Sequence, residues 1–152
     1  MSEPLIVLAP VPGRAMPMAE VPDPVFAESM VGPGSAIDPD RGPVVAVAPV
    51  SGRILKLHPH AYVILTESGR GVLVHLGIDT VQLKGEGFRL LVTEGDDVAS
   101  GTPVVEWDTT VVEAGGRSPV CPVVALDAPA DAVRDIAGAG RVAAGSDLFA
   151  WQ

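Results

Sequence analysis

The stretch AYVILTESGRGVLVH, residues 61–75, contains two apolar runs on either side of a short polar turn. The runs, Ala61–Thr66 and Gly71–His75, are rich in Val, Ile and Leu. Short runs of this composition, bounded by turn residues, are typical of β-strands. We therefore predict that the two runs pair as adjacent antiparallel strands, joined by the turn Glu67–Arg70.

The same pattern continues along the rest of the chain, between its 17 glycines and 15 prolines. Many short strands separated by turn signals predict an all-β fold, an antiparallel β-sandwich or barrel-like sheet with a few short helical turns. We expect helical turns at Asp108–Ala114 and Pro129–Ala137, and a surface loop at Gly32–Gly42. The further strands that we expect are Leu5–Leu8, Val44–Val47, Ile54–Leu57, Phe88–Val92, Pro103–Trp107, Val120–Leu126, Gly140–Ala144 and Leu148–Trp151.

A weak internal repeat is also present. The segment APVPGR at Ala9–Arg14 recurs as APVSGR at Ala48–Arg53, and an apolar run precedes each copy. Repeated supersecondary units leave this kind of trace in a sequence. We predict that the two copies form pseudo-symmetric hairpins in one sheet system.

The length of 152 residues fits one domain over residues 1–152, of which we expect residues 1–4 to be flexible. Hydrophobic residues make up 47% of the chain, which argues against a disordered protein. No apolar run approaches the length of a bilayer span, and no basic segment precedes Leu5–Ala9. We therefore predict a cytoplasmic protein without direct membrane insertion.

The charge and the cysteine content exclude several classes of protein. A formal net charge of −9 argues against nucleic-acid binding, which needs clustered Lys and Arg, and against adhesion to anionic membranes. The single cysteine, Cys121, excludes an internal disulfide. Its apolar neighbours indicate a small buried hydrophobic residue.

All three histidines, His58, His60 and His75, lie close together in the sequence. In the predicted pairing, His60 and His75 stand at the same end of two adjacent strands, where cross-strand Cβ atoms approach within roughly 5 Å. Two imidazoles there could share a small ligand or a phosphoryl group; for a phosphoryl group, one would be the nucleophile and the other a hydrogen-bond donor to the added oxygens. Asp79 follows beyond a glycine, where the chain can turn back. A purely structural role for the histidines is the alternative.

The residues around His75 form a longer motif. LVHLGIDTV at Leu73–Val81, followed by LKGEGF at Leu83–Phe88, resembles the central motif of the glucose-class enzyme IIA of the bacterial phosphoenolpyruvate:sugar phosphotransferase system. A second block, VPDPVFAE at Val21–Glu28, is similar as well. The resemblance extends from about Leu5 to the end of the chain.

This resemblance implies a β-sandwich and a phosphotransferase activity with a phosphohistidine intermediate. His75 would accept the phosphoryl group from the carrier protein HPr through Nε2 and pass it to the cysteine of an enzyme IIB domain during sugar uptake. His60 would stabilise the phosphohistidine. No cofactor is implied, although His60 and His75 could bind adventitious zinc. Some family members also bind regulatory protein targets.

Further roles follow from the resemblance for residues near the histidines. Asp23, Asp79 and Gly77 would flank the site. Val25 and Phe26 would form part of the apolar rim on which HPr and the IIB domain dock. One departure concerns the loop before His60, which is shorter than in the family and lacks the threonine whose hydroxyl bonds the active histidine. The sequence therefore leaves open what orients the imidazole of His75.

Two other classes of protein compete with this interpretation. A zinc metallopeptidase-like β-domain would use His58, His60, His75 and Asp79 as ligands, which are residue types suited to zinc. Its two motifs would occur in reverse order along the chain, and the match through Phe88 would stay unexplained. A biotinyl- or lipoyl-type carrier module would need a lysine at a hairpin tip, and the sequence does not offer one there.

Overall fold

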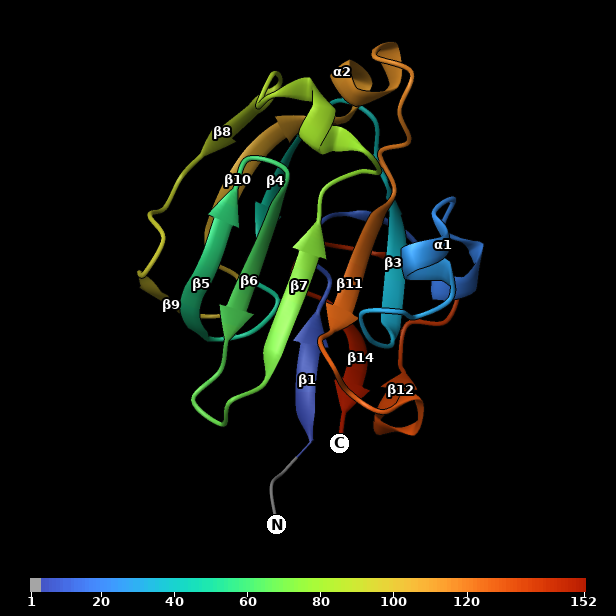
Figure 1. The fold of residues 1–152 in the computed structure, drawn as a ribbon, viewed down its shortest axis with the longest axis vertical. Coiled ribbons are helices and arrows are strands. Elements are labelled where there is room, and N and C mark those ends of the chain that lie inside the picture. The colour runs from blue at the N-terminus through green and yellow to red at the C-terminus, as the bar shows by residue number, and fades with distance from the viewer. Residues whose placement is uncertain (1–3) are drawn as a thin grey trace.

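The structure is a computed structural model that describes residues 4–152 (Figure 1). The strands are β1 (Leu5–Leu8), β2 (Gly13–Pro17), β3 (Gly34–Pro39), β4 (Pro43–Val47), β5 (Gly52–His58), β6 (Ala61–Leu65), β7 (Gly71–His75), β8 (Phe88–Leu90), β9 (Asp97–Val98), β10 (Pro103–Asp108), β11 (Cys121–Ala125), β12 (Val133–Asp135), β13 (Arg141–Val142) and β14 (Asp147–Trp151). The helical segments are α1 (Pro24–Ala27), α2 (Thr109–Ala114) and the 3₁₀ turns η1 (Met18–Glu20), η2 (Thr80–Leu83) and η3 (Ala130–Ala132). Of residues 1–4, which we predicted to be flexible, residues 1–3 lie outside the described residues.

The strands form one large sheet and two small ones, all with antiparallel pairing. The large sheet has eight strands in the order β13-β2-β3-β11-β7-β6-β5-β9. The small sheets have three strands each, in the orders β1-β14-β12 and β4-β10-β8. Side chains from the small sheets pack against the large sheet in one core. This arrangement confirms the predicted antiparallel sandwich, and the sheet does not close into a barrel.

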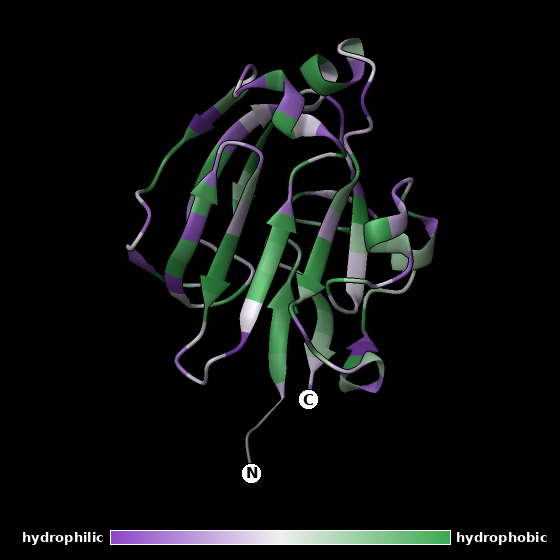
Figure 2. Ribbon diagram, viewed as in Figure 1, coloured by the Kyte–Doolittle hydropathy of each residue, from purple (hydrophilic) through white to green (hydrophobic). Residues whose placement is uncertain are grey.

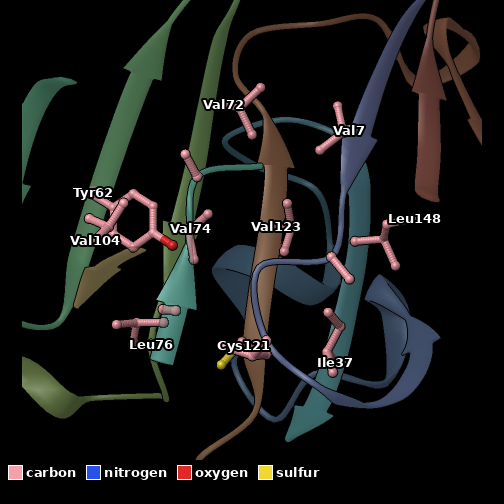
Figure 3. Close-up of a cluster of buried hydrophobic side chains, with 14 of the residues drawn as sticks. Val7, Ile37, Tyr62, Val72, Val74, Leu76, Val104, Cys121, Val123 and Leu148 are labelled. Atoms are coloured by element: carbon pink, nitrogen blue, oxygen red, sulfur yellow. The ribbon is translucent and has the colours of Figure 1, made fainter. Parts of the chain in front are cut away.

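The core lies between the layers and consists mainly of Val, Ile, Leu and Ala. Figure 3 shows Val7 of β1 and Leu148 of β14 with Val74 of β7 and Val123 of β11, and all four side chains are fully buried. Burying one such side chain stabilises the fold by about 1.5–3 kcal/mol. In Figure 2, hydrophobic residues dominate β1 and β7, and the connecting turns are largely hydrophilic. Cys121 is buried as predicted, and this burial raises the pKa of its thiol.

The predicted pairing of the two central runs is confirmed. β6 and β7 are antiparallel neighbours, with Ala61 opposite His75 and Leu65 opposite Gly71. In the turn, the Thr66 amide donates to the carbonyl of Arg70 at 2.9 Å. The register therefore carries the two ends that bear histidines to the same edge of the large sheet.

Two sequence predictions about local structure were wrong. The expected surface loop at Gly32–Gly42 contains β3, which lies between β2 and β11 in the large sheet. Gly34 lets its backbone approach β11 so closely that a Cβ there would lie 2.0 Å from the carbonyl oxygen of Val123. The expected helix at Pro129–Ala137 is η3 followed by β12. Because β12 pairs with β14, its backbone groups are satisfied in a sheet rather than in a helix.

The other local predictions hold with small differences. The expected helical turn before Ala114 is α2, and Asp108 caps it by accepting a hydrogen bond from the Thr110 amide at 2.9 Å. The expected strands are all present, although Gly140–Ala144 contains only the short β13. Among residues 4–152, no helix is long or apolar enough to cross a membrane.

The internal repeat corresponds to a pair of equivalent backbone contacts. The Leu8 amide donates to the carbonyl of Pro49 at 2.9 Å, and the Val47 amide donates to the carbonyl of Pro10 at the same distance. The two copies are therefore pseudo-symmetric. The predicted hairpins in one sheet were wrong, because each copy crosses from a small sheet, at β1 or β4, into the large sheet, at β2 or β5.

Candidate functional site

His60 and His75 meet at the edge where β6 begins and β7 ends. His75 is the last residue of β7, and His60 immediately precedes β6. The Leu76 amide donates to the carbonyl of His60 at 2.7 Å, which continues the ladder by one bond. The ring centroids of His60 and His75 lie 5.4 Å apart, with 66° between the ring planes. The structure thus brings the two predicted histidines together.

Two more rings extend this pair. His58, the last residue of β5, stacks on His60 with centroids 5.6 Å apart and is itself exposed. Phe26 of α1 also contacts His75, at 5.3 Å between centroids. The imidazole of His75 therefore contacts both an apolar ring and a second imidazole, and the side chain stays half-buried.

The orientation of His75 comes from the backbone. Its Nδ1 lies 2.5 Å from the carbonyl oxygen of Gly77. A carbonyl oxygen only accepts hydrogen bonds, so Nδ1 carries the hydrogen and Nε2 keeps its lone pair. This contact supplies the orienting partner that the sequence left open when the family's threonine was missing.

Gly77 has a conformation and a packing that few other residues tolerate. Its φ is +85°, and a Cβ at this position would lie 2.6 Å from Cγ2 of Thr80 and 3.0 Å from the carbonyl oxygen of Ser118. Thr80 in turn donates its hydroxyl to the carbonyl of Leu76 at 2.8 Å. Glycine therefore allows a tight turn directly after β7, and that turn aims its own carbonyl back at His75.

The two predicted carboxylates come from different elements. Asp23 caps α1, where its Oδ1 accepts from the Val25 amide at 2.9 Å and Pro24 occupies the first helical position. Asp79 is exposed and adopts a left-handed conformation, with φ of 58°, directly before η2. The negative charges of both carboxylates act to raise the pKa of His75, and their role in flanking the site stays a prediction.

The environment keeps both imidazoles neutral near pH 7. Burial lowers the pKa of His75 below its ordinary value, against the opposing effects of the Gly77 carbonyl and the charges of Asp23 and Asp79. Burial also lowers the pKa of His60, to about 4, and the positive charges that His75 and His58 would carry lower it further. The nucleophilic lone pair is therefore available at physiological pH.

Apolar side chains are exposed on the elements beside His75. Val25 is 41% exposed, whereas Phe26, the other predicted docking residue, is only 8% exposed and packs on His75. Docking by these two residues stays a prediction. Met30 and Val81, which the sequence analysis did not single out, are 69% and 58% exposed. Each follows a predicted site residue closely in the chain, but the sequence alone does not show that they escape the core.

The zinc alternative receives no support from the structure. Within residues 4–152, no group of three or more His, Cys, Asp or Glu side chains is arranged to hold a metal ion. A catalytic zinc site uses three protein ligands, so His60 and His75 alone do not provide one. Adventitious zinc binding by these two residues stays a prediction.

The comparisons with known proteins agree with one another. Residues 5–130 match the family described as phosphoenolpyruvate-dependent sugar phosphotransferase system, EIIA 1. The chain is 45% identical over 121 residues to the glucose-specific EIIA component of Halalkalibacterium halodurans, covering 78% of this chain and 69% of that protein. It is 38% identical over 141 residues to the N-acetylglucosamine-specific EIICBA component of Klebsiella pneumoniae, covering 91% of this chain but only 21% of that protein. The solved structure of glucose permease IIA from Mycoplasma capricolum superposes with a TM-score of 0.90 at 34% identity, over 99% of this chain and 97% of that one.

Proposed function

Because the chain belongs to the EIIA 1 family of the phosphoenolpyruvate-dependent sugar phosphotransferase system, we propose that it carries a phosphoryl group on Nε2 of His75. The observation that carries this proposal is the hydrogen bond from Nδ1 of His75 to the carbonyl of Gly77. It assigns the lone pair to Nε2, and a neutral imidazole with a fixed lone pair is the nucleophile that phosphoryl transfer requires.

The transfer proceeds in two displacement steps. Nε2 of His75 attacks the phosphorus of phosphohistidine on HPr, the new N–P bond forms, and the old N–P bond breaks with its electron pair returning to the imidazole of HPr. A cysteine thiolate of an enzyme IIB domain then attacks the same phosphorus, so that an S–P bond forms and His75 recovers its lone pair. Nδ1 keeps its hydrogen bond to Gly77 throughout, which avoids any change of tautomer between the steps.

His60 supports the phosphorylated state of its neighbour. Its ring stands edge-on to His75, and burial keeps it neutral before transfer. A neutral imidazole has one N–H to donate to a phosphoryl oxygen. The negative charge of the phosphoryl group would raise the pKa of His60 and strengthen that hydrogen bond. Backbone amides near Gly77 add further donors for the same charge.

The carboxylates and the apolar rim serve the partners. Asp23 and Asp79 lie near enough to His75 to repel a phosphate, so their role is to orient basic groups of HPr and of the IIB domain. Val25 of α1, Met30 just after α1 and Val81 of η2 expose apolar area. An apolar rim around a polar centre suits transient docking with two partners in turn.

Other parts of the proposal rest on the family alone. No cofactor is needed, because positioning and charge stabilisation account for the chemistry. The relatives include glucose-specific and N-acetylglucosamine-specific proteins, and the sugar is selected by a membrane component rather than by this site. A cytoplasmic location and regulatory protein targets remain predictions.

Phosphorylation by phosphoenolpyruvate, enzyme I and HPr tests the proposal. His75→Ala should abolish labelling, and His60→Ala should accept the phosphoryl group but pass it on poorly to a IIB domain. His58→Ala is the matched control, because His58 is an exposed imidazole in contact with His60 but not with His75, and it should retain both steps. Full labelling of His75→Ala would overturn the assignment.

A further inference from the structure

The turn that orients His75 is strained and depends on a neighbouring segment. Gly77 and Asp79 both have left-handed backbone conformations, with φ of 85° and 58°. For a residue with a Cβ, such as Asp79, this conformation persists only when surrounding contacts hold it. One such contact is the Ile78 amide, which donates to the carbonyl of Ser118 at 2.9 Å. The support therefore comes from the connection between α2 and β11.

Arg117 of that connection makes further contacts with the turn. Its Nε donates to the carbonyl of Asp79 at 3.2 Å, and its Nη2 donates to Oε1 of Gln82 at 2.6 Å. Its Nη1 donates to the carbonyl of Gly115 at 2.6 Å, which fixes the guanidinium to its own segment. Within the described part of the chain, Arg117 forms no ion pair with a carboxylate. Its donors are used instead to join two loops.

The planar guanidinium suits this task because its donors have a fixed geometry. The guanidinium is hydrogen-bonded to the carbonyl of Asp79 and to the side chain of Gln82 in η2. The His75 imidazole is hydrogen-bonded to the same backbone turn two residues earlier, at Gly77. Movement of Asp79 would rotate the peptide units on its N-terminal side, and these include the carbonyl that accepts from Nδ1. The imidazole and the guanidinium are thus coupled through three residues of backbone, Gly77–Asp79.

We infer that Arg117 is a positioning residue for phosphoryl transfer: by clamping the turn at Asp79 and Gln82, it keeps the Gly77 carbonyl on Nδ1 of His75 and so keeps Nε2 free as the nucleophile. This inference rests on the proposed function. Arg117 acts through the backbone of the turn, and its guanidinium donates to Asp79, Gln82 and Gly115 rather than to the imidazole. No feature of the sequence motif around His75 points to it, because it lies about forty residues further along the chain.

A tautomer measurement separates this role from a merely structural one. In ¹⁵N-labelled protein at about pH 8, above the ordinary histidine pKa, the two ring nitrogens of His75 report which one carries the hydrogen. Arg117→Ala should shift a measurable fraction of His75 to the Nε2–H form and slow phosphorylation by phospho-HPr about tenfold, the scale expected for a misplaced reacting group. Arg117→Lys should restore part of both, because one amine replaces only one donor of the fork.

The matched control is Arg89→Ala, which removes an arginine that binds Glu106 on the β4-β10-β8 sheet. It should leave the tautomer and the rate unchanged. A wild-type tautomer in Arg117→Ala would overturn the inference, even if the rate falls. If that variant does not fold, Gln82→Ala and Arg117→Lys carry the same measurement. The tautomer is read without any phosphate, so a failure of the proposed function would appear separately, as a wild-type protein that is not labelled on His75.

Discussion

Gly77→Ala perturbs the backbone that orients the active histidine, and its cost follows from two features of the turn. An alanine in the left-handed region costs about 1–2 kcal/mol. The added Cβ would also lie 2.6 Å from Cγ2 of Thr80 and 3.0 Å from the Ser118 carbonyl oxygen, and relieving such contacts costs about 1–2 kcal/mol more. We expect a loss of about 2–4 kcal/mol in the free energy of unfolding, which lowers Tm by about 6–12 °C in a protein of this size.

The matched control is Gly101→Ala. Gly101 has φ of 88°, close to that of Gly77, but a Cβ there would meet nothing within 4 Å. It should therefore show the backbone cost alone, about 1–2 kcal/mol, and retain phosphorylation. Gly77→Ala should in addition slow phosphorylation by phospho-HPr about tenfold or more, because the Gly77 carbonyl moves away from Nδ1. Thermal unfolding and labelling kinetics measure both effects. Equal stability of the two variants, with wild-type kinetics for Gly77→Ala, would refute this reasoning.

Three further predictions follow from the site. The pKa of His60 is about 6.5 in the unfolded chain and about 4 in the folded protein. As the pH is lowered from 6.5 to 4, the unfolded state therefore takes up the proton first, and the free energy of unfolding decreases. Urea unfolding of His60→Gln over the same range should show a decrease that is smaller by about 1–2 kcal/mol, a figure that already allows for solvent screening. Val81→Asp should weaken docking of HPr, measured as a raised KM for phospho-HPr. Val45→Asp is the control and should leave this KM unchanged, because Val45 is 39% exposed but lies in the β4-β10-β8 sheet, away from the sheet that carries the histidines. Asp23→Ala should cost about 1 kcal/mol of stability by removing the cap of α1, seen in thermal unfolding; no loss would contradict the capping role.

The central hairpin and the histidine pair could be predicted because local rules determine them. The polar turn between two β-branched runs sets the register of β6 and β7, and that register places His60 next to His75. The strand β3 was missed for the opposite reason. The segment around it, Gly32–Gly42, is rich in glycine and proline, which are typical of loops, and the burial of β3 depends on the distant partner β11.

The contacts that complete the site could not be predicted from the sequence either. The Gly77 carbonyl is a backbone group, so the residue type at position 77 does not indicate that this carbonyl will orient His75. Arg117 reaches the turn only because β11 runs beside β7. Met30 and Val81 are apolar residues whose exposure is decided by how α1 and η2 lie on the sheet. Such features depend on tertiary packing rather than on local pattern.

The identity of the phosphorylated atom tests the central claim most directly. ¹⁵N-labelled protein is phosphorylated with phosphoenolpyruvate, enzyme I and HPr, and the coupling between phosphorus and the imidazole nitrogens is measured by NMR. We predict that phosphorus is bonded to Nε2 of His75, with Nδ1 still protonated and hydrogen-bonded to Gly77. Phosphorus on Nδ1 of His75, or on His60, would contradict the account.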